Sequence, residues 1–283
     1  MEARQPSGTA QSAAIHRAEH QLYDFPRVLN DPLALWIIGP EGAMSIALGY
    51  WAAGLPGPRA MRAFIAARSR YAEDELARAV ASGTRQYVIL GAGLDTFAYR
   101  NPHAASGLSV FEVDHPDTQA WKRRRLALMG IPVPCSVTFV PLDFERRELP
   151  AGLEGRGFRR DEPAFFSWLG VTQYLSTETV MATFAQIRSF CPESAIAFDY
   201  ALPRDALPDA ETPTFDALSA RVDWEGEPFQ SFFRPECLAK DLKAIGFRRF
   251  ERPTADDLNA RYFHDRPDGL KVAGHLGGLM CAS

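Results

Sequence analysis

The residues best suited to chemistry are a glycine turn and an acid that follows it by about 20 positions. The apolar run 87–90 predicts a buried strand, and it leads into a turn formed by Gly91, Ala92 and Gly93. Glycines let a ligand approach the backbone closely because they carry no Cβ atom. A second strand-like run ends at Asp114, where a carboxylate can accept the hydroxyl hydrogens of a ribose. The pattern therefore predicts a nucleoside site at the tips of two strands.

The third position of the turn helps to decide which nucleoside binds. Turns that bind a dinucleotide carry a third small residue there, so that a helix N-terminus can close on the pyrophosphate. This chain has Thr96 instead, and Asp95 would direct a negative charge toward a phosphate. The turn therefore favours a ribose ligand without phosphate, such as S-adenosyl-L-methionine, whose sulfonium and ammonium groups are cationic. An NAD-dependent oxidoreductase is the weaker alternative, because no proton-relay pair accompanies the turn.

Four segments resemble the bacterial branch of the leucine carboxyl methyltransferase-like family. They are QYVILGAGLDTFAYR, VFEVDHPDTQAWKRRRL, VPLDFER and FFSWLGVTQYLS, and the resemblance extends in order from about Thr9 to the C-terminus. It implies S-adenosyl-L-methionine as the cofactor and an α/β fold of the class I methyltransferase (Rossmann-like) type. We expect a doubly wound, mostly parallel sheet with an N-terminal helical cap. The expected domains are a cap or lid over 1–83 and a Rossmann-like domain over 84–283, with an inserted cap segment around 202–234.

The resemblance also assigns roles to individual side chains. It places the ribose on Asp114, the adenine amino group on Asp143 and the adenine ring against Phe144. Each aspartate could instead cap a helix or a turn, which is a common use of that residue. The predicted cofactor-binding residues are Arg68, Gly91, Ala92, Gly93, Asp95, Asp114, His115, Asp143, Phe144, Leu169 and Gly170.

Two of these positions need separate comment. Arg68 is expected to bind the methionine carboxylate, because a guanidinium can hold a carboxylate with two parallel hydrogen bonds. Arg62 and Arg70 are nearby competitors, and a surface ion pair is the structural alternative. At Leu169 the chain departs from the family, since many relatives have a glutamate there, followed by the same glycine. The departure puts one cofactor or substrate contact in doubt, although Gly170 still allows close backbone approach.

Candidates for the chemical step are fewer. His20 and Tyr23 lie at helical spacing with Arg17, and His20 could orient or deprotonate an acceptor. A histidine on a helix surface is the interpretation that the sequence favours. Arg261 could anchor an anionic substrate, or it could be structural. Because a carboxylate acceptor needs no base, the lack of a clear base mildly favours that acceptor over a hydroxyl. We therefore predict an O-methyltransferase, with a cofactor-binding protein of degenerate catalysis as the alternative.

Composition argues against several other classes of function. The chain has 283 residues and a formal net charge of −4, so no global positive field predicts nucleic-acid binding. Four scattered cysteines indicate neither a metal site nor disulfides, which favours a cytoplasmic location. The polar N-terminus predicts no secretory signal, and breaks in the apolar window 33–55 predict no membrane span. We interpret the basic run 122–125 as a solvated helix face. The expected partner is a small-molecule acceptor, and the oligomeric state is not indicated.

Strands and helices alternate after Gly83, which predicts a parallel sheet covered on both faces. Before it we expect disorder over residues 1 to about 10, a helix over 10–23, and a helix capped by Asp31 with Pro32 at its first position. Two further helices are expected at 42–53 and 58–82. The predicted strands are 86–90, 108–113, 136–142, 164–169 and 194–200, with helices near 97–100, 116–129, 146–155 and 176–190 between them. Beyond the inserted segment we expect a helix at 235–246, a strand at 247–251, a helix at 255–261 and a last strand at 275–282.

Overall fold

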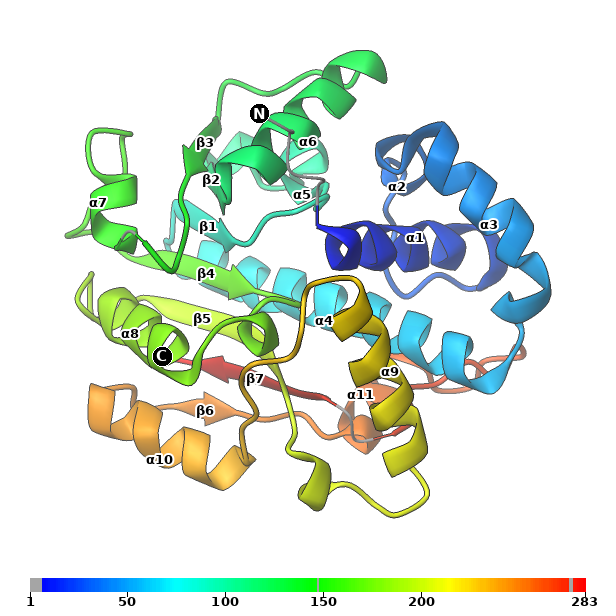
Figure 1. Ribbon diagram of the computed structural model, residues 1–283. Coiled ribbons are helices and arrows are strands. Elements are labelled where there is room, and N and C mark those ends of the chain that lie inside the picture. Colours follow the sequence, from blue (N-terminus) through cyan, green and yellow to red (C-terminus); the bar gives the residue numbers. More distant parts are fainter. Residues whose placement is uncertain (1–6, 147, 275–276) are drawn as a thin grey trace.

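The computed structural model describes residues 7–146, 148–274 and 277–283. Within these ranges seven strands form one sheet in the order β3-β2-β1-β4-β5-β7-β6 (Figure 1). The strands are β1 (Gln86–Leu90), β2 (Ser109–Asp114), β3 (Val137–Pro141), β4 (Ala164–Trp168), β5 (Ala195–Ala201), β6 (Phe250–Glu251) and β7 (Gly277–Ala282).

The sheet is mostly parallel, as predicted. Strand β1 pairs in parallel with β2 on one side and with β4 on the other, and only β7 runs antiparallel to its neighbours β5 and β6. The strand order therefore reverses between β1 and β4. In open α/β sheets this reversal leaves a crevice at the carboxyl ends of the two strands, because the connections leave in opposite directions.

Helices cover both faces of the sheet. The long helix α4 packs with α5 and α11 on one face, whereas α7, α8 and α10 pack on the other. Helices α1, α2, α3 and α6 form a third cluster, and Figure 1 shows α1 and α9 beyond the tip of β4. The helices are α1 (Gly8–Tyr23), α2 (Ala34–Ile37), α3 (Gly39–Ala53), α4 (Pro56–Ala81), α5 (Phe97–Arg100), α6 (Pro116–Leu128), α7 (Leu149–Leu153), α8 (Thr177–Arg188), α9 (Thr212–Trp224), α10 (Pro235–Ile245) and α11 (Ala255–Tyr262).

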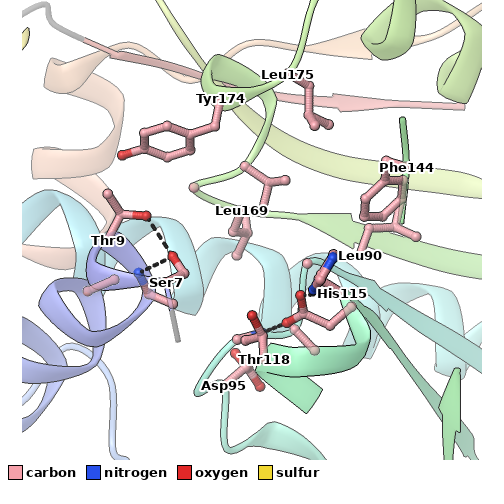
Figure 2. A pocket seen from close by; sticks show the side chains of 18 of the residues that line it. Ser7, Thr9, Leu90, Asp95, His115, Thr118, Phe144, Leu169, Tyr174 and Leu175 are labelled. Atoms are coloured by element: carbon pink, nitrogen blue, oxygen red, sulfur yellow. Dashed lines mark hydrogen bonds between the residues drawn. The ribbon is translucent and has the colours of Figure 1, made fainter. Parts of the chain in front are cut away.

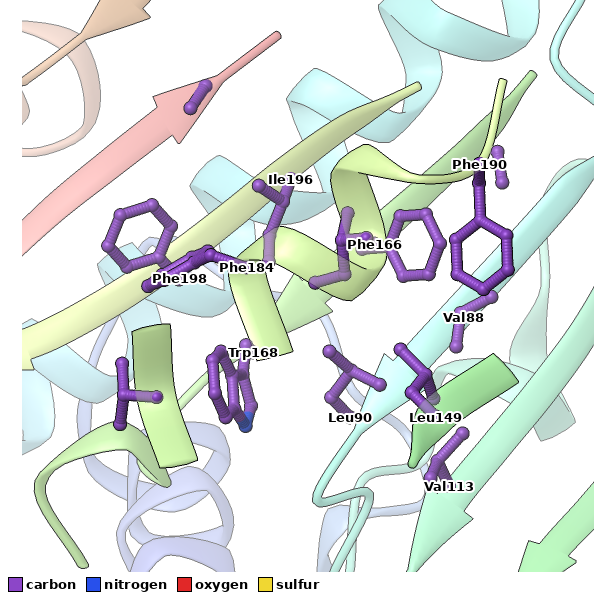
Figure 3. Packing of buried hydrophobic residues seen from close by; sticks show 14 of the residues in the cluster. Val88, Leu90, Val113, Leu149, Phe166, Trp168, Phe184, Phe190, Ile196 and Phe198 are labelled. Carbon is purple, nitrogen blue, oxygen red and sulfur yellow. The ribbon is translucent and has the colours of Figure 1, made fainter. Parts of the chain in front are cut away.

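Burial of both faces of the sheet explains why the central strands are continuous apolar runs in the sequence. In β1, Val88 and Leu90 enter the core on one face, and Tyr87 and Ile89 enter the core on the other. Side chains alternate between faces along a strand, so a strand buried on both sides needs apolar residues at every position. Figure 3 shows Val88 and Leu90 in the cluster that also contains Trp168. This packing fixes where β1 ends and hence where the glycine turn begins.

The N-terminal segment differs from its prediction in two places. Residues 8–10 are helical rather than disordered, because the Ser7 hydroxyl accepts the amide hydrogen of Ala10 at 3.1 Å and caps α1. Residues 1–6 lie outside the described residues. The helix predicted to start at Pro32 begins at Ala34 instead, because the Ala34 amide donates to the Asp31 carbonyl at 3.1 Å and closes a turn over 32–33. The Asp31 carboxylate still contacts this turn. It accepts the Leu33 amide hydrogen at 3.2 Å and a hydroxyl hydrogen from a distant part of the chain.

The basic run and the C-terminal strands also need correction. Lys122 is 1% exposed and Arg125 is 9% exposed, so half of the run 122–125 faces the interior rather than solvent. The predicted strand 247–251 is reduced to β6, because the amides of Arg248 and Arg249 both donate to the Ser283 carbonyl outside the ladder. The predicted last strand begins, in the described part, at Gly277, and His275 lies outside the described residues.

Two expectations about organisation stay predictions. Helix α4 shares a core with β1, although the expected boundary at residue 83 assigns it to the cap. The segment around 202–234 contains α9, which lies near the carboxyl ends of the strands (Figure 1). Within the described ranges, every helix is too short or too polar to cross a membrane.

Candidate active site

A cavity of about 410 Å³ lies where the strand order reverses. It is lined by the turn after β1, the tips of β2 and β3, the loop after β4, the start of α1 and the loop after α9 (Figure 2). The eleven residues predicted to bind the cofactor all line it, namely Arg68, Gly91, Ala92, Gly93, Asp95, Asp114, His115, Asp143, Phe144, Leu169 and Gly170. The structure thus brings together residues from five segments that are far apart in sequence.

The glycine turn allows close packing around the cavity. Gly91 and Gly93 have φ angles of +63° and +42°, in the region that residues with a Cβ atom rarely adopt. A Cβ on Gly91 would lie 2.3 Å from a methyl carbon of Val171, and one on Gly93 would lie 3.2 Å from the Cβ of Ala10. The turn therefore lets both the loop after β4 and helix α1 approach the tip of β1.

Asp114 is held at the tip of β2 by backbone donors. Its carboxylate accepts the amide hydrogen of Gly93 at 2.5 Å and that of His115 at 2.6 Å. Burial raises the pKa of Asp114, although these two hydrogen bonds favour the charged form. Each oxygen keeps a further lone pair for a ligand donor. The residue can therefore accept two hydroxyl hydrogens from within the cavity.

The tip of β3 supplies a second acid beside an aromatic ring. The Asp143 carboxylate accepts the Glu145 amide hydrogen at 3.0 Å and lies 3.9 Å from the ring nitrogen Nε2 of His115. Phe144 follows it and packs against Trp168 with ring centroids 5.9 Å apart. In Figure 2, Phe144 and His115 lie at the end of the cavity opposite Tyr174. A flat heterocycle with an amino group fits between such an acid and such a ring.

Arg68 projects from α4 into the other end of the cavity. Its Nη1 donates to the Asp199 carboxylate at 2.5 Å, and the second oxygen of Asp199 accepts the Gly170 amide hydrogen, also at 2.5 Å. A Cβ on Gly170 would lie 2.7 Å from Nη2 of Arg68, so the glycine is needed for the guanidinium to lie here. The competing arginines pair elsewhere, Arg62 with Asp24 and Arg70 with a carboxylate one turn along α4.

A buried network ties α1 and the segment before α2 to the turn. Arg17 donates to the Leu94 carbonyl at 2.5 Å and lies 3.7 Å from Asp31. The hydroxyl of Thr96 donates to Asp31 at 2.6 Å, and Asp31 is fully buried. This contact explains the larger residue at the third position of the turn. Thr96 anchors the helical cap there, and no phosphate needs the space.

His20, which was predicted for the chemical step, does not line the cavity. It is fully buried, with Nδ1 2.9 Å from the Asp24 carboxylate. Its Nε2 accepts the amide hydrogens of Val28 and Leu29 at 3.0 and 3.2 Å. Because both ring nitrogens are occupied, His20 has no free atom with which to take a proton from an acceptor. Its geometry is that of a structural link between α1 and the following loop.

Tyr23 and Arg261 also lie away from the cavity. The Arg62 guanidinium carbon is 5.8 Å from the centre of the Tyr23 ring, on the side of α1 where Arg62 meets Asp24. Arg261 pairs with Glu251 at 2.9 Å, near β6. The structure therefore gives neither residue a contact with the cavity in which the predicted cofactor residues meet.

Several lining residues were not predicted. Ser7 and Thr9 line the cavity from the start of α1, Tyr174 from the loop after β4, and Glu227 from the loop after α9. Asp199, which holds Arg68, lies at the tip of β5 and could have been found from the rule that ligands bind at strand tips. No comparable pattern singles out Glu227 among the acids of its segment.

Comparisons with known proteins show which family and which fold the chain is similar to. Residues 10–188 match the family model described as leucine carboxyl methyltransferase. A Bacillus subtilis protein named "Putative S-adenosyl-L-methionine-dependent methyltransferase YktD" is 31% identical and matches over 96% of each chain. A Saccharopolyspora erythraea protein with the same description is 32% identical, over 97% of this chain and 94% of that one. A "putative methyltransferase" from Thermobifida fusca has the same fold, with a TM-score of 0.59 and 16% identity over 95% of this chain and 93% of that one.

Proposed function

The chain belongs to the leucine carboxyl methyltransferase family and is an S-adenosyl-L-methionine-dependent methyltransferase, and from that premise we propose that it methylates an oxygen atom of a small molecule. The acceptor oxygen belongs to a carboxylate or a hydroxyl group. The choice of oxygen rests on His20, the candidate base, which is buried with both ring nitrogens in hydrogen bonds, because a carboxylate acceptor needs no base. The placement of the cofactor rests on the meeting of Arg68, Asp114 and Asp143 in one cavity. Their chemistry supports binding of an amino-acid carboxylate at the arginine, and of a ribose and an aminated base at the two aspartates.

The chemistry of the cavity walls fits this cofactor. Arg68 would hold the carboxylate of the methionine part, Asp114 the ribose hydroxyls, and Asp143 with Phe144 the adenine. The glycine turn supports the assignment, because a Cβ on Gly91 would collide with Val171 and alter the wall of the cavity. The cofactor supplies a methyl group on a sulfonium, which is already an activated leaving group.

The protein's part in the reaction is orientation and the exclusion of water. In-line displacement requires the acceptor oxygen to be held close to the methyl carbon, and holding the two together supplies much of the rate. The start of α1 and the loop after α9 both line the cavity, and together we call them its roof. A roofed cavity supports a small-molecule acceptor rather than a folded protein. Tyr174 lies on that side, and burial raises the pKa of its phenol, so it stays protonated and acts as a hydrogen-bond donor.

The nature of the acceptor atom can be tested by the stability of the product. The protein is incubated with methyl-tritiated S-adenosylmethionine and a panel of small carboxylic acids, phenols and alcohols, with heat-inactivated protein as the control. A methyl ester releases tritiated methanol in mild alkali, whereas a methyl ether retains the label. Either result supports transfer to oxygen. Label that resists alkali and is located on nitrogen, sulfur or carbon by mass spectrometry would contradict the proposal.

A further inference from the structure

Glu227 lines the cavity beside the start of α1, with one carboxylate oxygen free. Its Oε2 accepts hydrogen bonds from the Ser7 hydroxyl at 3.2 Å and the Thr9 amide at 3.0 Å. Both side-chain hydrogen bonds that Glu227 makes within the described part of the chain go to Oε2, and Oε1 has none there. The side chain is half-buried and belongs to the loop after α9. A charged oxygen without a protein partner is thus available at the wall of the cavity.

Glu227 and Arg68 lie at the same end of the cavity. The charges of both act on the phenol of Tyr174. Figure 2 shows Tyr174, Thr9 and Ser7 together at this end and Phe144 at the other. An acid and a guanidinium that face one cavity from opposite segments suit a ligand that carries an anion and a cation a few atoms apart.

The methionine part of the cofactor is such a ligand, because it carries an α-carboxylate and an α-ammonium on one carbon. Desolvating the ammonium without an acceptor would be costly. Leu169, which lines the same cavity, offers only an apolar side chain. Asp199 is 4% exposed, and its two oxygens already accept hydrogen bonds from Arg68 and Gly170.

Asp95 is the remaining competitor among the acids of the turn. One of its oxygens accepts the Phe97 amide hydrogen at 2.7 Å and caps α5. Its charge acts on Tyr87, Tyr99 and Glu73, which lie on the side of α4 and α5. Figure 2 shows Asp95 beside Thr118, away from the end of the cavity at which Tyr174 lies near Ser7 and Thr9.

We propose that the Glu227 carboxylate binds the ammonium group of the cofactor's methionine part through Oε1, while Oε2 holds the start of α1 over the cavity. The inference rests on the proposed placement of the cofactor, with its carboxylate at Arg68. It does not depend on whether the acceptor is a carboxylate or a hydroxyl. Glu227 then acts in ligand binding and in closure of the roof at the same time.

The test compares two ligands that differ only at this end. S-adenosylhomocysteine carries the ammonium and the carboxylate, whereas 5′-methylthioadenosine has neither. Glu227→Gln keeps an oxygen that can accept from Ser7 and Thr9 but removes the charge. We expect it to weaken S-adenosylhomocysteine binding about tenfold or more by isothermal titration calorimetry, and 5′-methylthioadenosine binding less than about twofold.

Three further variants separate the alternatives. Arg68→Gln should show the same selective loss, because it removes the partner of the carboxylate. Asp223→Asn is the matched control, since Asp223 is an exposed acid on the last turn of α9 that does not line the cavity, and it should change neither affinity. Ser7→Ala removes a contact of the roof without removing a charge, so it should weaken both ligands by the same factor.

Four results would overturn the contact. An equal loss of both ligands, or no loss, in Glu227→Gln would mean that the carboxylate serves only the roof. A selective loss in Asp95→Asn but not in Glu227→Gln would assign the ammonium to Asp95. If the wild type bound neither ligand, the proposed cofactor site would be wrong. The proposed contact of Glu227 would then be wrong as well. A selective loss in Glu227→Gln would stand even if the methylated atom proved not to be oxygen.

Discussion

Gly170 shows how a single missing side chain shapes the cavity. Its φ is +72°, and a Cβ there would meet Nη2 of Arg68 at 2.7 Å. Gly170→Ala should therefore displace the guanidinium and weaken S-adenosylhomocysteine binding about tenfold, measured by calorimetry. Gly107→Ala is the control, because Gly107 has a φ of +75° with open space around it. Both variants should lose about 1 kcal/mol of unfolding free energy. Equal affinities in the two variants would mean that Arg68 does not hold the ligand.

Asp114 is the residue on which ribose recognition depends. Asp114→Ala should weaken S-adenosylhomocysteine binding at least tenfold, because two hydroxyl hydrogens lose a charged acceptor. Circular dichroism should show an unchanged fold. Burial raises the pKa of Asp114, so in the wild type the carboxylate becomes protonated at a higher pH than an exposed aspartate. Wild-type affinity should therefore fall as the pH is lowered through that pKa. The alanine variant should lack this part of the pH dependence, and an unchanged affinity at neutral pH would refute the ribose assignment.

Residues at strand tips could be predicted from sequence, whereas residues that act across the chain could not. Asp114 and Asp143 follow recognisable apolar runs, and the tip of a strand in a parallel sheet faces one known edge. His20 has the chemistry of a base, but its contacts with Asp24 and two backbone amides depend on how α1 meets the next loop. Residue type alone does not reveal whether a nitrogen is already occupied.

At the scale of elements, α1 and α4 are joined by a buried ion pair. Arg62 donates to both oxygens of Asp24, at 2.7 and 2.9 Å. Burial alone would raise the pKa of Asp24, but hydrogen bonds from His20 and Arg62 outweigh it and lower the pKa to about 2. Because this folded-state pKa lies below the unfolded value, the pair contributes about 2 kcal/mol of stability at neutral pH. That contribution is present above about pH 4 and is lost as the pH falls toward 2.

Asp24→Asn tests this link between the two helices. It removes the carboxylate charge beside the buried Arg62 guanidinium, so the free energy of unfolding at pH 7 should fall by about 3 kcal/mol in urea titrations. The gap between the variant and the wild type should narrow between pH 4 and pH 2, because Asn does not titrate. A constant gap over that range would show that the charge of Asp24 contributes nothing.

A second buried ion pair lies beside the glycine turn after β1. Lys122 on α6 donates to the Glu112 carboxylate of β2 at 2.8 Å and reaches the Ala92 carbonyl at 3.5 Å. Lys122→Met should cost about 3 kcal/mol of unfolding free energy, because it removes the cation beside the buried Glu112 and leaves the carboxylate with the hydrogen bond from the Tyr99 hydroxyl at 2.9 Å. Adding Glu112→Gln should recover part of that loss. A double variant no more stable than Lys122→Met would contradict a direct pair.

The pH dependence of that single variant gives an independent check. Burial already raises the pKa of Glu112, and loss of Lys122 removes the charge that opposes the rise. A folded-state pKa above the unfolded value means that the folded state binds the proton more tightly. The stability of Lys122→Met relative to the wild type should therefore improve as the pH falls from 8 toward 5. Chemical denaturation at several pH values measures this difference.

The central elements were predictable because their patterns are local. The apolar runs that form β1 and β4 are buried on both faces, and Thr254 with Asp257 forms the capping box that begins α11. The run 122–125 was misread, since a lysine and an arginine in a basic stretch become buried only when distant partners are present. Those partners, Glu112 and Glu41, lie on other elements and give no local signal.

At the scale of the whole molecule, the cavity is closed by two parts of the chain that are more than 200 residues apart. The start of α1 and the loop after α9 meet at Glu227, a separation of 218 residues from Thr9. The sequence predicted that both regions cap the site, the first from the family resemblance and the second from its composition, but their mutual contact could not be derived from either segment. A sheet can be inferred from periodicity, whereas the docking of two caps depends on side chains that pair only in the folded chain.

This arrangement predicts that ligand binding and closure of the roof are coupled. A ligand that contacts both the sheet edge and the roof stabilises the closed form by its differential affinity for that form. Hydrogen exchange of the amides in 8–13 and 226–230 should therefore slow several-fold when S-adenosylhomocysteine is added. Exchange in α10, on the far face of the sheet, should change little and serves as the internal control. In Glu227→Gln at saturating ligand the protection should be smaller, because the ammonium no longer connects the ligand to the roof. Protection confined to the tips of β1 and β2 would show that the ligand does not stabilise the roof. The cofactor would then be recognised by the sheet edge alone.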